Sequence, residues 1–228
     1  MVVRILLTND DGWDAPGLAA LKKLARRFGE VLVLAPREPH SYAGHRVTTD
    51  CPLVLAETGS QEFTLTGTPA DCVRLAVTTL FRDIDWVFSG INRGGNLGAD
   101  LFTSGTVAAV REAALLGRPG IAVSQYVRKG MALDWERSSE LALPVIEQLI
   151  AEGCPPKGYW NVNLPHVEAG ENPAVIRCDP DDEPLDVHFR REGDCFHYDG
   201  SYASRRRTAG KDVERCFGGS ITVSRLLL

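Results

Sequence analysis

Two adjacent aspartates, Asp10 and Asp11, follow the first apolar run of the chain, residues 2–8. That run is short and rich in valine, leucine and isoleucine, which is typical of a buried β-strand. Two carboxylates side by side at a strand end repel each other, and a shared proton or a bound cation relieves the repulsion. We therefore interpret the pair as part of a divalent metal site. The competing interpretation is an ordinary polar turn, which an isolated Asp-Asp-Gly sequence fits equally well.

Strand and helix patterns alternate through the first two thirds of the chain. Strands are expected at residues 2–8, 31–35, 84–89 and 119–124, extended pairs at 47–66, and helices at 16–28, 72–81, 107–116 and 135–151. Thr68 and Asp71 have the spacing of a capping box at the start of one helix. Repeated strand-helix-strand units predict an α/β fold, a Rossmann-like, mostly parallel sheet with helices on both faces.

The pattern changes near residue 154. Residues 154–228 contain more proline, aspartate, arginine and aromatic residues, and the helical period fades. We expect residues 1–153 to form the Rossmann-like core and residues 154–228 to form a β-rich C-terminal segment. Within that segment, residues 185–228 are predicted to form a hairpin and a partly exposed extension.

Three polar loops, at residues 9–14, 37–46 and 90–98, each follow a predicted strand directly. In an open parallel sheet, ligands bind outside the carboxyl ends of the strands. We therefore expect the polar side chains of these loops to share one rim: Asp10, Asp11, Ser41, Asn92 and Asn96. Carboxylate, hydroxyl and amide oxygens suit Mg²⁺, Mn²⁺ or Ca²⁺ better than zinc or copper. The donors are too few to saturate such an ion, which leaves positions for water and a substrate oxygen.

The tripeptide Ser104-Gly105-Thr106 opens a predicted helix. The N-terminus of a helix offers free backbone N–H groups and a favourable dipole to an anion. Alone, such a tripeptide is more often a plain helix cap, and asparagines such as Asn92 and Asn96 alone are more often ordinary turn residues. Together with a metal site at neighbouring strand ends, an anion site predicts a phosphate ester as the ligand.

Composition excludes several functional classes. The formal net charge of −5 argues against a general nucleic-acid-binding protein. No apolar stretch approaches the roughly 18 residues that span a bilayer. The six cysteines form no C-x-x-C pair, and the N-terminus has no signal-peptide layout, so we expect reduced thiols and a cytoplasmic protein without a membrane partner.

The motifs, taken together, resemble the SurE family, the stationary-phase survival proteins that act as metal-dependent 5′-nucleotidases. The matching segments are T-N-D-D-G (8–12), A-P-x-x-x-x-S-x-A-G-H (35–45), T-G-T-P-A-D-C-V (66–73), S-G-I-N-R-G-G-N-L-G (89–98), S-G-T-V-A-A (104–109) and G-x-S-I-T-V (218–223). The resemblance implies hydrolysis of nucleoside 5′-monophosphates, and in some members of 3′-nucleotides or short polyphosphate. It also implies a cytoplasmic homodimer or homotetramer that exchanges C-terminal segments, for which residues 185–228 would be the oligomerisation arm.

The resemblance also implies roles for individual residues. It places one divalent metal ion per subunit, Mg²⁺ or Mn²⁺ ahead of Ca²⁺, and its ligands would be Asp10, Asp11, Ser41 and Asn92. The residues on the phosphate side would be Asn9, Asn96, Ser104, Gly105 and Thr106. The chain departs from the family in the 37–46 loop, where His40 replaces the usual arginine and Tyr42 follows Ser41.

As the mechanism we expect that Asp10 or Asp11 activates a metal-bound water while Asn96 stabilises charge on the phosphoryl oxygens. One rival interpretation is an aspartyl-phosphate phosphatase of the haloacid dehalogenase type, although that chemistry uses D-x-D rather than adjacent acids. A second is a non-catalytic nucleotide-sensing α/β module. Separately, the run 205–207 of three arginines could be a solvated loop, an RNA contact or a phosphate clamp that reaches a neighbouring active site.

Overall fold

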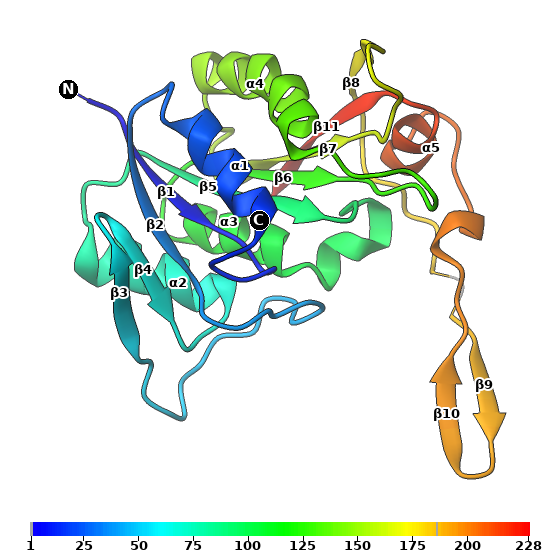
Figure 1. The fold of residues 1–228 in the computed structure, drawn as a ribbon, viewed down its shortest axis with the longest axis horizontal. Coiled ribbons are helices and arrows are strands. Elements are labelled where there is room, and N and C mark those ends of the chain that lie inside the picture. Colours follow the sequence, from blue (N-terminus) through cyan, green and yellow to red (C-terminus); the bar gives the residue numbers. More distant parts are fainter. Residues whose placement is uncertain (1, 186) are drawn as a thin grey trace.

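The computed structural model describes residues 2–185 and 187–228 and contains a nine-stranded sheet with the strand order β3-β4-β2-β1-β5-β6-β7-β11-β8 (Figure 1). The strands of this sheet are β1 (Arg4–Thr8), β2 (Glu30–Pro36), β3 (Leu55–Gly59), β4 (Glu62–Leu65), β5 (Trp86–Arg93), β6 (Gly120–Gln125), β7 (Gly158–Leu164), β8 (Val175–Arg177) and β11 (Ile221–Leu227). Neighbouring strands are parallel except for the pairs β3–β4 and β7–β11. The predicted α/β class with a mostly parallel sheet is confirmed.

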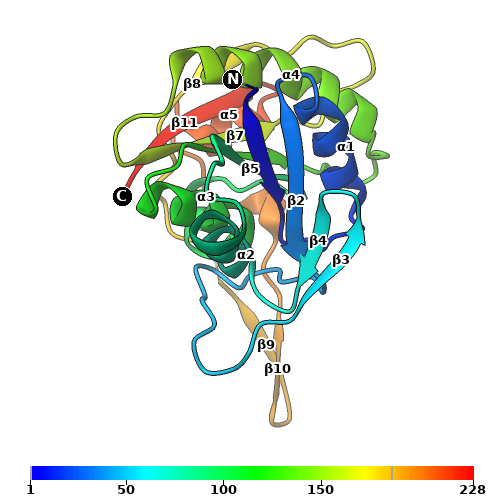
Figure 2. The same cartoon turned by 90° about the vertical axis from the view of Figure 1, so that its left-hand side faces the viewer.

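Helices cover both faces of the sheet, as predicted (Figure 2). On one face, α1 (Pro16–Ala25) and α4 (Trp135–Glu152) pack on one set of alternating strand residues, which includes Ile5 and Leu7. On the other face, α2 (Pro69–Leu75) and α3 (Gly105–Leu115) pack on the opposite set, which includes Leu6. Successive side chains of a strand point to opposite faces, so both faces of β1 are apolar and its polar residues lie at its two ends.

Helix α2 begins with the predicted capping box. Thr68 Oγ1 accepts a hydrogen bond from the backbone N–H of Asp71 at 3.2 Å, and the Asp71 carboxylate accepts one from the N–H of Thr68 at 3.0 Å. Pro69 occupies the first turn, where its missing N–H costs nothing. The helix then continues as one wide turn over residues 76–80. Its fixed start matters for the site because Asp71 also binds the chain entering from the 37–46 loop.

The predicted loop at residues 90–98 is wrong at its beginning, because β5 continues to Arg93. Ile91 is fully buried in the core beneath α1, which keeps the chain in the sheet. Gly90 makes the continuation possible, since a Cβ at this position would lie 2.1 Å from the carbonyl oxygen of Val123. The register against β6 shifts between Ser89 and Asn92, so Asn92 is a strand residue displaced by an irregularity and not a loop residue.

The chain beyond residue 153 joins the same sheet through β7, β11 and β8. It also forms the antiparallel hairpin β9 (Phe189–Glu192) and β10 (Cys195–Tyr198), whose eight residues are all exposed and which projects away from the body of the protein (Figure 1). A short helix, α5 (Asp212–Phe217), interrupts the segment in which we expected only strands, a hairpin and an extension. Six residues are too few to give a visible helical period, which is why the sequence did not reveal it.

No helix within the described residues is long and apolar enough to cross a membrane. All six cysteines are free thiols, and Cys72 and Cys216 are buried in the interior. This agrees with the expectation of reduced thiols.

Candidate metal and phosphate site

The acidic pair lies where the order of the strands reverses. From β1 the chain continues to β2 on one side, whereas β5 lies on the other side of β1. Crevices at such a reversal, outside the carboxyl ends of the strands, are the usual ligand sites of open α/β sheets. Asp10 and Asp11 follow β1 at this point, and Asn92 lies at the end of the neighbouring strand β5.

Asp10 is buried against the N-terminus of α3. Its Oδ1 accepts a short hydrogen bond from the Thr106 hydroxyl, and the Thr106 backbone N–H also faces the carboxylate. Gly105 permits this approach, because a Cβ there would lie 2.8 Å from Asp10 Cβ and 3.0 Å from Asp10 Oδ2. The first turn of α3 therefore presents hydrogen-bond donors and the positive end of its dipole to the Asp10 carboxylate.

Asp11 is held by the end of β5. Its Oδ2 accepts a hydrogen bond of 3.0 Å from the backbone N–H of Arg93. The side-chain Nδ2 of the neighbouring Asn92 donates a hydrogen bond to the carbonyl oxygen of Gly94 at 2.8 Å. The amide oxygen Oδ1 of Asn92 therefore remains as the atom that can bind a cation. Both Asp11 and Asn92 are partly exposed, in contrast to Asp10. The structure thus brings two carboxylates and one amide together from adjacent strands.

The loop that carries Ser41 is tied to this point from both sides. The backbone N–H of His40 donates to the carbonyl oxygen of Asp10 at 2.8 Å, and the N–H of Gly44 donates to the carbonyl oxygen of Thr103 at 2.9 Å. Ser41 itself is exposed, one residue beyond the contact with Asp10. Since two residues span at most about 7 Å, Ser41 lies close to the acidic pair.

A buried carboxylate anchors the end of the same loop. Glu112 on α3, which is 1% exposed, binds His45 Nε2 through one oxygen and Arg74 Nε through the other, both at 2.8 Å. Burial alone would raise the pKa of Glu112, but the hydrogen bonds from His45 and Arg74 outweigh it and lower the pKa below its ordinary value. Next to it, Thr48 binds Asp71 through its N–H and its hydroxyl at 2.8 and 2.7 Å. These contacts fix the loop against α2 and α3.

Asn96 and Ser104, two of the residues predicted on the phosphate side, are held by hydrogen bonds to residues other than the acidic pair. Asn96 is 6% exposed, donates Nδ2 to Ser124 Oγ at 2.7 Å and donates its backbone N–H to Asn163 Oδ1 at 2.8 Å. Its contacts are therefore with β6 and β7, whereas those of Asp10 are with the 37–46 loop and α3. Ser104 Oγ caps α3 by accepting from the N–H of Val107 at 3.0 Å, as expected for a helix cap.

Asn9 lies directly before the acidic pair and is fully buried. Its Nδ2 donates to the carbonyl oxygen of Gly12 at 2.7 Å, while its Oδ1 is buried without a hydrogen-bond partner among the described residues. An unpartnered buried amide oxygen is costly, and it commonly marks the position of a bound water or ligand. This orphaned atom beside the pair is consistent with a site that is completed by something other than protein.

The electrostatics of the pair favour a cation. Burial raises the pKa of Asp10 to about 6; the neighbouring Asp11 adds to the rise, and the hydrogen bond from Thr106 opposes it. Burial also raises the pKa of Asp11, against the opposing contribution of Arg93. The folded protein therefore disfavours the charged form of both carboxylates, and a positive charge placed between them would offset that cost. The residues present therefore fit a divalent metal ion.

The donor chemistry narrows the choice of ion. Residues 2–185 and 187–228 contain no group of three or more His, Cys, Asp or Glu side chains able to hold a metal. A metal at Asp10 and Asp11 would therefore need neutral oxygens, such as those of Ser41 and Asn92, to complete its shell. Two carboxylates with neutral oxygens suit a hard cation that keeps part of its water, as Mg²⁺ does.

Sequence reasoning missed two contacts at this site. We assigned Thr106 to phosphate, but its hydroxyl faces Asp10, and nothing in the spacing of the two residues indicates that pairing. The pairing of Glu112 could have been anticipated from the sequence, because a carboxylate on the largely apolar helix α3 (Gly105–Leu115) needs a partner.

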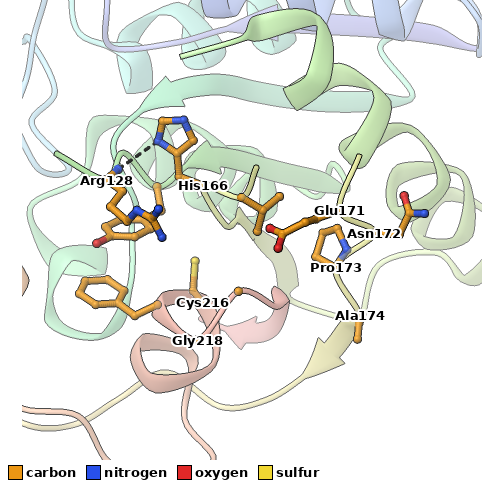
Figure 3. A pocket seen from close by; sticks show the side chains of 12 residues that line it. Arg128, His166, Glu171, Asn172, Pro173, Ala174, Cys216 and Gly218 are labelled. Carbon is orange, nitrogen blue, oxygen red and sulfur yellow. Dashed lines mark hydrogen bonds between the residues drawn. The ribbon is translucent and has the colours of Figure 1, made fainter. Parts of the chain in front are cut away.

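Two cavities lie along the same sheet edge but away from the pair. One of about 440 Å³ lies beside α5 and is lined among others by Tyr126, Arg128 and His166 (Figure 3). Arg128 donates its backbone N–H to His166 Nδ1 at 3.1 Å there. The other, of about 830 Å³, lies beneath residues 130–134. Among the described residues that line these two cavities, neither Asp10 nor Asp11 occurs.

Comparison with known proteins finds a matching protein family. The family model described as Survival protein SurE matches residues 5–179. A protein from Nostoc sp. (strain PCC 7120), provisionally named a 5′-nucleotidase, is 46% identical over 223 residues, which cover 97% of this chain and 98% of that protein. The 5′-nucleotidase SurE of Paramagnetospirillum magneticum is 37% identical over 233 residues, covering 98% and 89% of the two chains.

Among solved structures, the crystal structure of the SurE protein from Aquifex aeolicus superimposes with a TM-score of 0.87. The identity is 29%, and the match covers 98% of this chain and 93% of that one. The similarity therefore includes the strands that carry the acidic pair as well as most of the C-terminal segment.

Proposed function

The chain belongs to the SurE family, and we propose that it is a metal-dependent phosphomonoesterase that hydrolyses nucleoside 5′-monophosphates. The observation that carries this proposal is the placement of two adjacent, partly desolvated carboxylates at the reversal of strand order, with Asp10 against the N-terminus of α3 and Asp11 on the end of β5. Such a site offers a cation to one side of a phosphoryl group and helix donors to the other. The names of the relatives add the nucleotide as substrate class.

The metal ligands in this proposal are Asp10, Asp11, Ser41 and Asn92. One divalent ion per subunit fits this oxygen set, with Mg²⁺ or Mn²⁺ favoured over Ca²⁺ because open positions must remain. When bound, such an ion would polarise a phosphoryl oxygen and lower the pKa of a coordinated water. Asp10, fixed by Thr106 and His40, supplies a rigid ligand, while the more exposed Asp11 is the better placed carboxylate to orient the attacking water and accept its proton.

The remaining residues would act on the phosphate. The positive end of the α3 dipole, at Gly105 and Thr106, would favour the developing negative charge, while the Thr106 hydroxyl and N–H hold Asp10. The side chains of Asn9, Asn96 and Ser104 would be the other groups on the phosphate side. Direct attack by water would make a covalent phosphoenzyme unnecessary. All the groups named would contact only the phosphoryl end of the substrate. The site would therefore also accept 3′-nucleotides and short polyphosphate as secondary substrates.

Assembly and location are part of the same proposal. We propose residues 1–153 as the catalytic core of a cytoplasmic enzyme, with residues 154–228 as its C-terminal segment. Within residues 185–228, the arm that builds a homodimer or homotetramer would be the projecting hairpin β9–β10, because β11 at the end of this range is a strand of the central sheet. The hairpin supports this assignment, because Phe189, Phe196 and Tyr198 are each about three-fifths exposed. Clustered exposed aromatic side chains commonly mark a surface that binds another protein chain.

The direct test is phosphate release from AMP, 3′-AMP and polyphosphate with Mg²⁺, Mn²⁺ or Ca²⁺, and with EDTA in place of metal. We expect rapid release from AMP that needs Mg²⁺ or Mn²⁺ and disappears with EDTA, because the protein donors alone cannot activate water. Equal rates with EDTA would contradict a metal site. Tight AMP binding without any release would instead identify a nucleotide-sensing module.

A further inference from the structure

The three arginines at 205–207 have three different surroundings. The Arg206 side chain is 74% exposed. The Arg207 guanidinium lies 4.5 Å above the ring of Phe217. The Arg205 side chain, in contrast, is 5% exposed and forms an ion pair of 2.6 Å between its Nη1 and Asp100 Oδ2. Arg205 is therefore neither a solvated loop residue nor free to bind RNA.

Asp100 connects Arg205 to the start of α3. Its Oδ2 accepts hydrogen bonds from Arg205, from the Tyr202 hydroxyl at 2.9 Å and from the N–H of Leu97 at 3.3 Å. Its carbonyl oxygen accepts from the N–H of Ser104 at 3.0 Å. One residue thus joins the segment after the hairpin to the helix cap at the proposed phosphate site.

The same segment also holds the chain on both sides of Asn96. Arg205 Nη2 donates to the carbonyl oxygen of Leu97 at 3.2 Å, and the Tyr202 hydroxyl, which donates to Asp100, also lies 3.2 Å from the carbonyl oxygen of Gly95. The Arg205 guanidinium lies 5.1 Å from the Tyr202 ring, so the two side chains support each other. The geometry of Asn96 is therefore set in part by residues more than 100 positions later in the chain.

We propose that Arg205 is a positioning residue for phosphate binding and turnover. Through Asp100 and Leu97 it fixes residues 95–104, so that Asn96 and the first turn of α3 face the phosphoryl group. This inference rests on the proposed function of the site. The rest of the loop keeps independent anchors, including Asn163 on the N–H of Asn96 and Asp212 on the N–H of Gly98 at 2.9 Å. Loss of Arg205 should therefore misplace the donors without unfolding the protein.

The test compares Arg205→Gln with Arg206→Gln, its exposed neighbour. We expect Arg205→Gln to lower kcat for AMP about 10–100-fold and to weaken binding of inorganic phosphate, measured by calorimetry with Mn²⁺, several-fold. Arg206→Gln should leave both unchanged. Arg205→Lys should recover only part of the loss, because an ammonium cannot reproduce two bonds from one planar group.

Two further readouts separate positioning from general damage. Millimolar methylguanidinium should restore activity to Arg205→Gly, and Asp100→Asn combined with Arg205→Gln should lose little more than either change alone. Wild-type activity and phosphate affinity in Arg205→Gln would overturn the inference while leaving the proposed function intact. A kcat loss that follows the unfolded fraction, without rescue, would also overturn it. If the wild-type protein releases no phosphate, the proposed function fails, and the affinity for inorganic phosphate then decides the role of Arg205. An affinity unchanged in Arg205→Gln would overturn that role. A wild-type protein that does not bind phosphate would also overturn it.

Discussion

Replacing Asp10 by asparagine is expected to reduce phosphate release from AMP on the order of 10³-fold, the scale on which central electrostatic groups act in catalysis. Asparagine has the same shape and can still accept the hydrogen bond from Thr106, so the site should keep its geometry. What it loses is the negative charge that, together with Asp11, would hold the cation. Steady-state kinetics with Mn²⁺ measures the effect.

The same variant should gain stability in the metal-free state. Because the pKa of Asp10 is raised from 3.8 to about 6 in the folded protein, ionising it there costs about 3 kcal/mol at neutral pH. That cost is absent below pH 4, where the group is protonated in both states, and reaches full size above pH 6. Thermal melting with EDTA should therefore show Asp10→Asn melting above the wild type at pH 8 and level with it near pH 4.

The matched control is Asp14→Asn, which changes an exposed carboxylate in the same loop. It should alter neither activity nor melting temperature. If Asp10→Asn kept near-wild-type turnover, the acidic pair could not be the catalytic metal site. A variant that lost activity and also lost stability at pH 8 would point instead to a structural role for Asp10.

Glu112→Gln is expected to lower the stability of the protein by about 2 kcal/mol, or roughly 4–8 °C in melting temperature. The wild-type carboxylate is buried and joins His45 and Arg74, so the neutral amide replaces two charge-assisted hydrogen bonds by weaker ones. Because His45 lies at the end of the loop that carries Ser41, the variant should also bind Mn²⁺ more weakly. Thermal melting at pH 7 and metal titration measure the two effects.

The stability difference between the wild type and Glu112→Gln should change with pH. The pKa of Glu112 is lower in the folded protein than its ordinary value of 4.5, so its stabilisation is fully present above pH 4.5 and is lost as the pH falls through the lower, folded value. The gap in melting temperature between wild type and Glu112→Gln should therefore be widest at neutral pH and close in acid. Glu147→Gln, at an exposed position of α4, is the control and should show no gap. A gap of equal size at pH 7 and pH 3 would show that packing, not charge, is responsible.

Much of the fold was predictable from local patterns. The apolar runs behind Asp10 and Asn92 and the capping box at Thr68 are determined by neighbours in sequence, and the structure confirms them. The common rim of the acidic pair and Asn92 followed from a general rule about parallel sheets and not from any contact. Such features depend on periodicity and chain direction, which a sequence displays.

The features that could not be predicted depend on contacts between distant segments. Arg205 meets Asp100 across 105 positions, and Thr106 meets Asp10 across 96. Neither pairing changes the local pattern at either end. The end of β5 was misjudged because Gly90 and Asn92 are typical loop residues, while the burial of Ile91 between sheet and α1, a tertiary effect, keeps the chain extended.

The most direct test is to locate Mn²⁺ by anomalous diffraction in crystals of this protein grown with the ion. The account predicts one strong peak per chain at about 2.0–2.6 Å from oxygens of Asp10 and Asp11, with Asn92 and Ser41 beside it and open positions toward α3. A map with no peak at that rim, or with Mn²⁺ bound only elsewhere on the protein, would contradict it.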